Sequence, residues 1–298
     1  MSIGPFFRPR EDDKFMDAEK AQPWTVRTAS GMVASAMFPD WQRLFPMTDH
    51  RFQMGLRAGD ARGFWAGGDA TGDTWRQRQQ WLRQDRSLYA AEVPEGRAIL
   101  AEARQWIAQW TSRCAADWVA LSADVETEAV VLGGEVVFPS SWSLPEKLGL
   151  PLSSVHGPVP GLDGALGRTM GVFLARIEPG QAWERDNWGL SADAELNHHP
   201  ARRPPPLGGT ARPESTWIRL ERQFLTRLPA TRGVLFGIQV SLHRLDAVAA
   251  LPGIAQGLIR NLETMSAEVA LYKGLLEARD PLIRQLRLIS PDASDSGR

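Results

Sequence analysis

The stretch "TWIRLERQFLTRLPATRGVLFGIQVSLHRL", residues 216–245, predicts the centre of the fold. Two runs rich in aliphatic and aromatic residues, 217–228 and 234–242, flank the tetrapeptide "PATR". A four-residue connection between two such runs is typical of an antiparallel hairpin. The sequence therefore predicts two long paired strands here.

Three segments upstream are expected to extend this hairpin into a sheet. They read "WVALSADVE" (118–126), "AVVLGGEVVF" (129–138) and "MGVFLARIEPG" (170–180), and each contains a short run of apolar residues typical of a strand. Gly133 and Gly134 are expected to form a hairpin turn, because paired glycines adopt turn conformations readily.

Helical periodicity marks segments on both sides of the predicted sheet. Apolar residues follow one face in "WRQRQQWLRQDRSLY" (75–89) and "PEGRAILAEARQWIAQW" (94–110), and a proline lies near the first turn of the second. Between residues 258 and 276, apolar residues step by four and three and predict an amphipathic helix. The order helices, antiparallel strands, helix indicates an α+β fold with one sheet covered by helices.

The chain is expected to form one compact unit with four parts. These are an irregular N-terminal wrap with helices (1–118), the sheet (119–250), a C-terminal helical segment (251–290) and a disordered tail (291–298). Residues 190–216 are rich in proline and lack apolar periodicity, which predicts a long surface loop, either a lid or an inert insertion.

The overall charge disfavours nucleic acid and membrane surfaces as partners. Thirty-four basic and 35 acidic residues among 298 give a net charge of −1. No apolar run approaches the roughly 18 residues that span a bilayer, so a cytoplasmic protein with a small-molecule or protein partner is expected.

Cys114 is the only cysteine, which excludes an internal disulfide and an iron–sulfur cluster held by four cysteines of this chain. Cys114 also lacks the basic, glycine-rich setting of a reactive thiol.

One histidine stands in an unusually stiff setting. In "PLSSVHGPVPG" (151–161), prolines on both sides of His156 restrict the backbone and lower the entropy cost of holding the imidazole in place. Such a residue suits a metal that needs a single protein ligand, and haem iron is one, since the porphyrin supplies four nitrogens. The alternative is a structural histidine hydrogen-bonded to the backbone.

The other histidines carry weaker expectations. No two of the five histidines form the i, i+4 helical pair of a zinc peptidase. His198 and His199 are expected to be solvated in the long loop, and His243 is expected on the polar face of its strand, in phase with Ser241.

An arginine lies in the apolar row of the predicted strand 217–228. At period two, Arg222 shares a face with Leu220 and Phe224. A guanidinium that points toward a core requires an anion, either a protein carboxylate or a ligand group. An ordinary internal salt bridge or a register bulge remains the alternative.

The segment "QAWERDNWGL" (181–190) places charges between Trp183 and Trp188. The two tryptophans are either core anchors or walls of a pocket for a cationic amine or a stacked ring. No G-x-G-x-x-G, P-loop or G-x-S-x-G motif is present, so self-contained hydride transfer, nucleotide hydrolysis and α/β-hydrolase chemistry have no motif support.

Several separated motifs together resemble the haem-dependent oxidative N-demethylase family, of which the haem subunit of dimethylamine monooxygenase is an example. They are "FPSSWSLPEKLGLPLSSVHGPVPG" (138–161), "WERDNWGL" (183–190), "IRLERQFLTRLPATRGVLFGIQVSL" (218–242) and "YKGLL" (272–276). The resemblance runs from about Pro5 to Leu288, nearly the whole chain.

This resemblance implies a PAS-like sheet that binds haem b and oxidises a small N-methylated amine with O₂, releasing formaldehyde. His156 matches the family's H-x-P-V-P histidine and is the expected axial ligand of the iron. Arg222, with Arg185 as a second candidate, is expected to pair with a haem propionate. Glu184 or Glu221 is expected to orient the cationic amine. Electrons are expected from a separate reductase and ferredoxin-type protein, with tetrahydrofolate as a formaldehyde acceptor.

The chain departs from the family pattern in two places. The loop 190–216 is longer and richer in proline than expected, and Phe224 stands where a threonine is usual, which predicts a phenylalanine near the pocket and a different substrate. Two alternatives remain open. One is a non-catalytic haem sensor, which would suit an oligomer formed through the helix 258–276, and the other is a haem-free interaction protein.

Overall fold

The computed structural model describes residues 39–67, 69, 71–122 and 128–289. The expectations for residues 1–38 and for the tail 291–298 fall outside these ranges. The described strands form one antiparallel sheet in the order β1-β5-β6-β7-β3-β4-β2. Their bounds are β1 Arg57–Ala58, β2 Ala90–Glu92, β3 Asp117–Leu121, β4 Val131–Glu135, β5 Ala182–Ser191, β6 Trp217–Arg227 and β7 Val234–Arg244.

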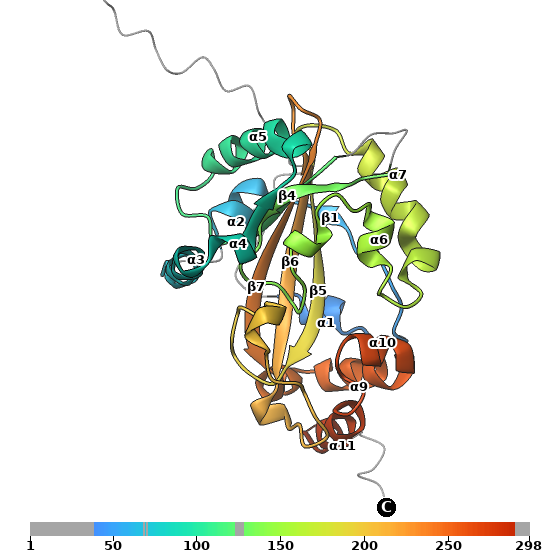
Figure 1. Cartoon of the computed structure of the whole chain (residues 1–298). Helices are drawn as coiled ribbons and strands as arrows, with labels where there is room; N and C mark the ends of the chain where they lie inside the picture. The colour runs from blue at the N-terminus through green and yellow to red at the C-terminus, as the bar shows by residue number, and fades with distance from the viewer. Residues whose placement is uncertain (1–38, 68, 70, 123–127, 290–298) are drawn as a thin grey trace, which may run out of the picture.

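Helices surround the sheet on both faces and at one end (Figure 1). The α-helices are α1 Trp41–Leu44, α2 Ala61–Trp65, α3 Asp73–Gln84, α4 Arg86–Tyr89, α5 Arg97–Ala108, α6 Leu152–His156, α7 Arg168–Arg176, α8 Leu245–Ala249, α9 Ile254–Thr264, α10 Ala267–Tyr272 and α11 Arg279–Ile289. A π-helix, η3 Asp163–Gly167, precedes α7, and single 3-10 turns are η1 Pro94–Gly96, η2 Pro145–Lys147, η4 Pro200–Arg202 and η5 Pro213–Ser215. Each of these helices is too short or too polar to cross a bilayer. The expected α+β fold is confirmed.

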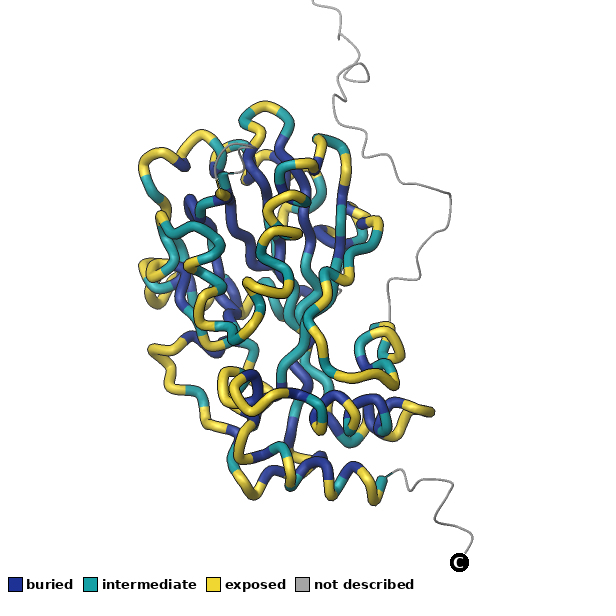
Figure 2. The backbone as a smooth tube through the Cα atoms, turned by 90° about the vertical axis from the view of Figure 1, so that its right-hand side faces the viewer, coloured by how far each residue is buried: buried dark blue, intermediate teal, exposed yellow. Residues whose placement is uncertain are grey.

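Apolar side chains cover both faces of the sheet and also fill the contact between one end of the sheet and helices α9–α11. Phe224 of β6 packs with α2 and α5 on one face, whereas Leu225 packs with α6 and α7 on the other. A third cluster joins Ile218 to the C-terminal helices. Figure 2 shows that the buried backbone follows the long strands, while the outer turns are exposed. The two faces of the sheet therefore have different neighbours, α2 and α5 on one and α6 and α7 on the other.

The predicted hairpin is the longest pairing in the sheet. β6 and β7 pair from Trp217–Arg244 at one end to Arg227–Val234 at the other, and residues 228–233 connect them. β1 and β2, which precede residue 119 in the chain, pair with β5 and β4 and complete the two edges of the same sheet.

The expected turn at Gly133 and Gly134 is wrong, because both glycines lie inside β4. They pair with Ala120 and Val119 of β3. A Cβ added to Gly134 would lie 2.2 Å from the Trp118 carbonyl oxygen, and one added to Gly133 would lie 2.6 Å from the Ala91 carbonyl oxygen. Glycine is present because neighbouring backbones approach closely, a role that sequence does not distinguish from a turn.

Replacement of Gly134 by alanine is expected to lower the free energy of unfolding by about 1–3 kcal/mol, as for overpacked sites. Urea denaturation followed by tryptophan fluorescence measures this loss. Gly189→Ala in β5 is the control, because open space surrounds a Cβ there and alanine is at least as favourable as glycine in a strand. Equal midpoints for the two variants would contradict the packing argument.

Two expected elements differ in type or number. The segment 170–180 forms α7 instead of a strand, and the buried Arg227 donates hydrogen bonds to the carbonyls of Leu174 (2.5 Å) and Ile177 (2.6 Å) at its C-terminal end. A short apolar run does not distinguish helix from strand by itself.

The expected helix 258–276 is two helices, because Met265 is extended and Ser266 caps the N-terminus of α10.

The division into two helices bears on the oligomer contact that was expected through residues 258–276. Four residues of the apolar stripe are buried within the chain, namely Leu258, Leu262, Met265 and Val269. Tyr272 and Leu276 are exposed. Most of the stripe therefore packs against the chain's own core.

The prediction that His198 and His199 are solvated is wrong, since they are 5% and 4% exposed. The His198 Nε2 lies 2.8 Å from an Asp193 carboxylate oxygen, and the His199 ring packs edge-on against Tyr89. The buried Arg219 holds this part of the 190–216 segment against the sheet by donating to the carbonyls of residues 195 and 196. His243 shares its face of β7 with Ser241, as expected, at a 2.9 Å separation of Nε2 and Oγ.

A buried ion pair connects α3 to the sheet. Arg78 and Asp117 are each 1% exposed and form a hydrogen-bonded salt bridge. The Asp117 carboxylate also accepts from the backbone N–H groups of Val137 (2.7 Å) and Phe138 (2.8 Å). Nearby Cys114 is a free thiol whose pKa burial raises to about 11, which keeps it protonated at neutral pH.

Candidate functional site

The register of β5 and β6 places the expected site residues on opposite faces of the sheet. Arg185 pairs with Gln223 and Asn187 with Glu221, and these side chains face α6 and α7. The intervening residues, which include Glu184 and Arg222, face α2. The structure therefore brings His156, Arg185 and Glu221 to one side and separates Glu184 and Arg222 from them.

On the α2 side, Glu184 and Arg222 form an internal salt bridge. The Arg222 Nε and Nη2 donate to the two Glu184 carboxylate oxygens at 2.8 and 2.9 Å, a bidentate arrangement. Glu184, 3% exposed, also accepts from Arg57 and from the Asp60 backbone N–H. This is the alternative that the sequence left open for Arg222, and it ties the segment before α2 to the sheet.

Phe224 also lies on the α2 side. It is fully buried and its ring centroid is 5.0 Å from that of Phe64. Phe224 was expected near the pocket, but it lies on the face opposite α6 and does not line the cavity beside His156. Face alternation along β6 places it opposite Glu221, so this departure from the family pattern does not bear on the α6-facing site.

His156 is the last residue of α6, which begins directly after Pro151. Its Nδ1 is buried and has no hydrogen-bond partner among the described residues. The structural alternative, a histidine bonded to the backbone, is therefore not seen there. Burial lowers the pKa of His156, and Arg185 lowers it further, so the imidazole is neutral near pH 7. A neutral ring nitrogen is the form that binds a metal.

Two more nitrogens on this face are buried and have no hydrogen-bond partner within residues 39–67, 69, 71–122 and 128–289. They are Nε1 of Trp183 and Nε of Arg185, on alternate residues of β5. Trp183 packs edge-on against Phe173 of α7, at 5.6 Å between ring centroids. Burial lowers the pKa of Arg185, although Glu221 opposes the shift. Buried donors without acceptors are rare in proteins, and each is a position where a water or a ligand group would supply the missing acceptor.

A cavity of about 500 Å³ lies beside His156. Side chains of α6, η3 and α7 line it, among them Leu152, Met170 and Leu174. The volume and the largely apolar wall are typical of small-molecule and cofactor sites.

Glu221 is held by three neutral donors. Its carboxylate accepts from Ser140 Oγ at 2.7 Å, Asn187 Nδ2 at 3.1 Å and Gln223 Nε2 at 2.9 Å. These bonds fix the orientation of the carboxylate without neutralising its charge.

Sequence reasoning missed Lys273, at the C-terminal end of α10. Its Nζ donates to the Trp188 carbonyl at 2.9 Å and lies 5.3 Å from the centroid of the Trp188 ring. Burial lowers the pKa of Lys273, while Glu221 acts to raise it. Trp188 itself packs against Phe45 in the C-terminal core, so it is both an anchor and a support for Lys273. The one available signal was a lysine next to the apolar stripe of the predicted helix, in the motif "YKGLL".

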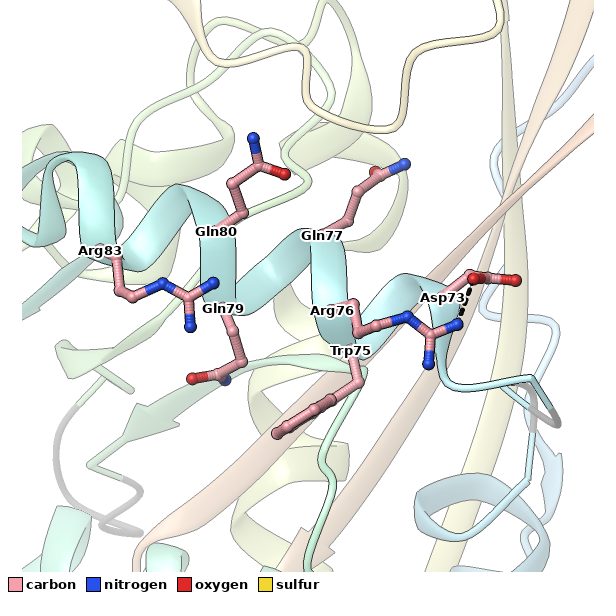
Figure 3. A pocket seen from close by; sticks show the side chains of 7 residues that line it. All are labelled: Asp73, Trp75, Arg76, Gln77, Gln79, Gln80 and Arg83. Atoms are coloured by element: carbon pink, nitrogen blue, oxygen red, sulfur yellow. Dashed lines mark hydrogen bonds and ion pairs between the residues drawn. The ribbon is translucent and has the colours of Figure 1, made fainter.

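A second depression lies along the outer face of α3 and carries no comparable chemistry. Figure 3 shows its side chains projecting from the helix in different directions, with one ion pair between Asp73 and Arg76. Both members of that pair are more than half exposed. Such a solvated helix face does not define a site.

The fold and the site define an α+β protein with a largely apolar cavity beside a short helix, α6, that ends in a histidine. Residues 75–283 match the family described as haem-dependent oxidative N-demethylase, alpha subunit-like. Because this match spans more than half of the chain, the chain belongs to that family.

Proposed function

We propose that the chain is the haem-binding subunit of an oxidative N-demethylase that acts on a small N-methylated amine. The observation that carries the proposal is a set of three buried nitrogens, on His156, Trp183 and Arg185, that find no hydrogen-bond partner in the part of the chain that the structure describes. Trp183 and Arg185 share one face of β5, His156 belongs to α6, which packs on that face, and all three lie within the residues that match the family.

These residues fit a haem b group. His156 offers a neutral, unpaired imidazole for the iron, and one axial histidine is sufficient for haem. Arg185 is a partly buried guanidinium that forms no ion pair with a carboxylate of the described residues, which suits a propionate. Arg222, the other propionate candidate, is paired with Glu184 on the far face, so we assign the propionate to Arg185.

When bound, haem would supply the oxidation of the N-methyl group by O₂, with formaldehyde as a product. The contribution of the protein is to hold the amine and to exclude water. Glu221 is the carboxylate that we assign to the cationic amine, because it lies on the His156 side and, among the described residues, only neutral donors are hydrogen-bonded to it. Glu184 is the less suitable candidate, since two arginines already satisfy it.

Partners complete the proposed reaction. A single cysteine cannot hold an iron–sulfur cluster of the four-cysteine type, so electrons would come from a separate reductase and ferredoxin-type protein. The name of the family, alpha subunit-like, supports a multi-component enzyme. Tetrahydrofolate is a candidate acceptor of the formaldehyde.

The functional test is formaldehyde release by the haem-reconstituted chain with a chemical reductant, O₂ and a panel of methylamines. Release that depends on both haem and amine supports the proposal. A stable haem complex that oxidises no methylamine would favour a sensor, and a chain with no affinity for haem would contradict the proposal.

Two isosteric substitutions separate the candidate carboxylates. Glu221→Gln is expected to weaken amine binding by at least about tenfold, because a charge-assisted contact is lost. Glu184→Gln is expected to leave amine affinity within about twofold and to lower the melting temperature, because it leaves Arg222 without its anion. Titration of the amine into each protein by calorimetry measures the first effect and a thermal melt the second. The reverse pattern would assign the amine to Glu184.

A further inference from the structure

Ser140 lies between two charged residues of β6, Glu221 and Arg219. Its Oγ donates to Glu221 Oε1 at 2.7 Å. The same Oγ accepts from Nε of the buried Arg219 at 3.4 Å. A serine hydroxyl has a single hydrogen, and a guanidinium has no acceptor. The hydroxyl hydrogen of Ser140 therefore points at the Glu221 carboxylate.

The donors are unevenly divided between the two oxygens of the Glu221 carboxylate. Asn187 Nδ2 at 3.1 Å and Gln223 Nε2 at 2.9 Å both donate to Oε2, whereas Ser140 is the one described donor to Oε1. A carboxylate has about four acceptor positions, so the described residues leave one position open on Oε1. Without Ser140, the carboxylate would pivot about Oε2. Ser140 therefore fixes the direction in which the open position points.

The long loop after β5 holds the segment that carries Ser140. Ser140 and His198 of this loop form a parallel bridge. The buried Arg219 donates to the Pro139 carbonyl at 3.4 Å and to the carbonyls of residues 195 and 196 at 2.7 and 2.9 Å. One guanidinium thus ties the segment before Ser140 to the loop.

We propose that Ser140 is a positioning residue that orients Glu221 toward an N–H group of the bound amine, and that the long loop after β5 supports it. The inference rests on the function proposed above and adds the residue that sets the direction of this contact. A hydrogen bond depends on direction, whereas the attraction between two charges does not. An ammonium ion with an N–H group gains both, and a quaternary ammonium ion gains the attraction alone.

Two ions of equal charge separate direction from attraction, namely dimethylammonium, which carries N–H groups, and tetramethylammonium, which has none. Each is titrated by calorimetry into the full chain, with and without bound haem. The wild type is expected to bind dimethylammonium at least about tenfold more tightly. In Ser140→Ala this preference is expected to fall to within about threefold, because the directional part of the contact is lost.

Two further variants separate the hydroxyl from general effects on the fold. Ser140→Thr keeps the hydroxyl and is expected to retain the wild-type preference within about twofold. Ser241→Ala is the matched control, because Ser241 also bonds a side chain, that of His243, but lies on the opposite face of the sheet from Glu221. It is expected to leave the preference unchanged.

Arg219→Lys tests the support from the loop. A lysine keeps the charge but lacks the planar fork that holds both segments. The preference is expected to fall by at least about threefold, with no further fall when Ser140→Ala is added, because both changes act through one hydroxyl. If a thermal melt shows that Arg219→Lys does not fold, Asn197→Ala takes its place, since it removes the loop's hydrogen bond to Tyr89.

The outcomes distinguish this inference from the function on which it rests. A wild-type preference retained in Ser140→Ala would overturn the role of Ser140 and leave the proposed function standing. An effect of Arg219→Lys that adds to that of Ser140→Ala would overturn the role of the loop. A wild-type chain that binds neither ion would overturn the proposed function, and the inference with it.

Discussion

Replacement of His156 by alanine is expected to lower haem affinity by at least about 100-fold and to remove or shift the Soret band. The imidazole is the metal ligand that we assign, and even changes around a metal ligand cost 10–100-fold in affinity. Its Nδ1 has no other partner among the described residues, so the substitution removes no protein hydrogen bond. Haem titration followed by ultraviolet–visible spectroscopy, before and after reduction, measures the effect.

The control for this substitution is His243→Ala. His243 lies beside Ser241 at the end of β7 and contacts Trp41, away from α6. This variant is expected to bind haem as the wild type does. Added imidazole is expected to restore a histidine-like spectrum to the His156→Ala protein, since the ring would enter the space left by the side chain. An unchanged spectrum and affinity in His156→Ala would remove His156 from the site.

Replacement of Asp117 by alanine is expected to lower the free energy of unfolding by about 3–5 kcal/mol, as for one partner removed from a buried ion pair. The change leaves Arg78 without its fully buried carboxylate, although Glu135 still accepts from it at 3.0 Å. It also removes the acceptor of the Val137 and Phe138 backbone N–H groups. Urea denaturation followed by tryptophan fluorescence gives the free energy.

Glu178→Ala is the control for Asp117→Ala. Glu178 and its partner Arg232 are about half exposed, so solvent screens their ion pair and little stability should be lost. The double variant Asp117→Leu with Arg78→Met is expected to recover part of the loss, because it removes both buried charges together. A loss of less than about 1 kcal/mol in Asp117→Ala would show that Glu135 alone compensates Arg78.

The structure explains why some local predictions held and others did not. The β6–β7 hairpin and α5 are encoded by long periodic runs, and such runs specify an element by themselves. Gly133 and Gly134 were misassigned because glycine serves turns and close backbone contacts equally well. His198 and His199 were misassigned because the burial of their loop depends on Arg219, a residue of a distant strand.

The sequence by itself determined the α+β class, the central hairpin and a stiff segment around His156. Period-two alternation also identified Arg222 as an arginine that needs an anion. Only the tertiary structure decided which charges act together. The register of β5 on β6 places Arg185 and Glu221 on one face and Glu184 and Arg222 on the other, and the docking of α10 brings Lys273 to the edge of β5. The physical reason is that alternation fixes the two faces of one strand, whereas the relation between faces of different elements depends on pairing and packing across the chain.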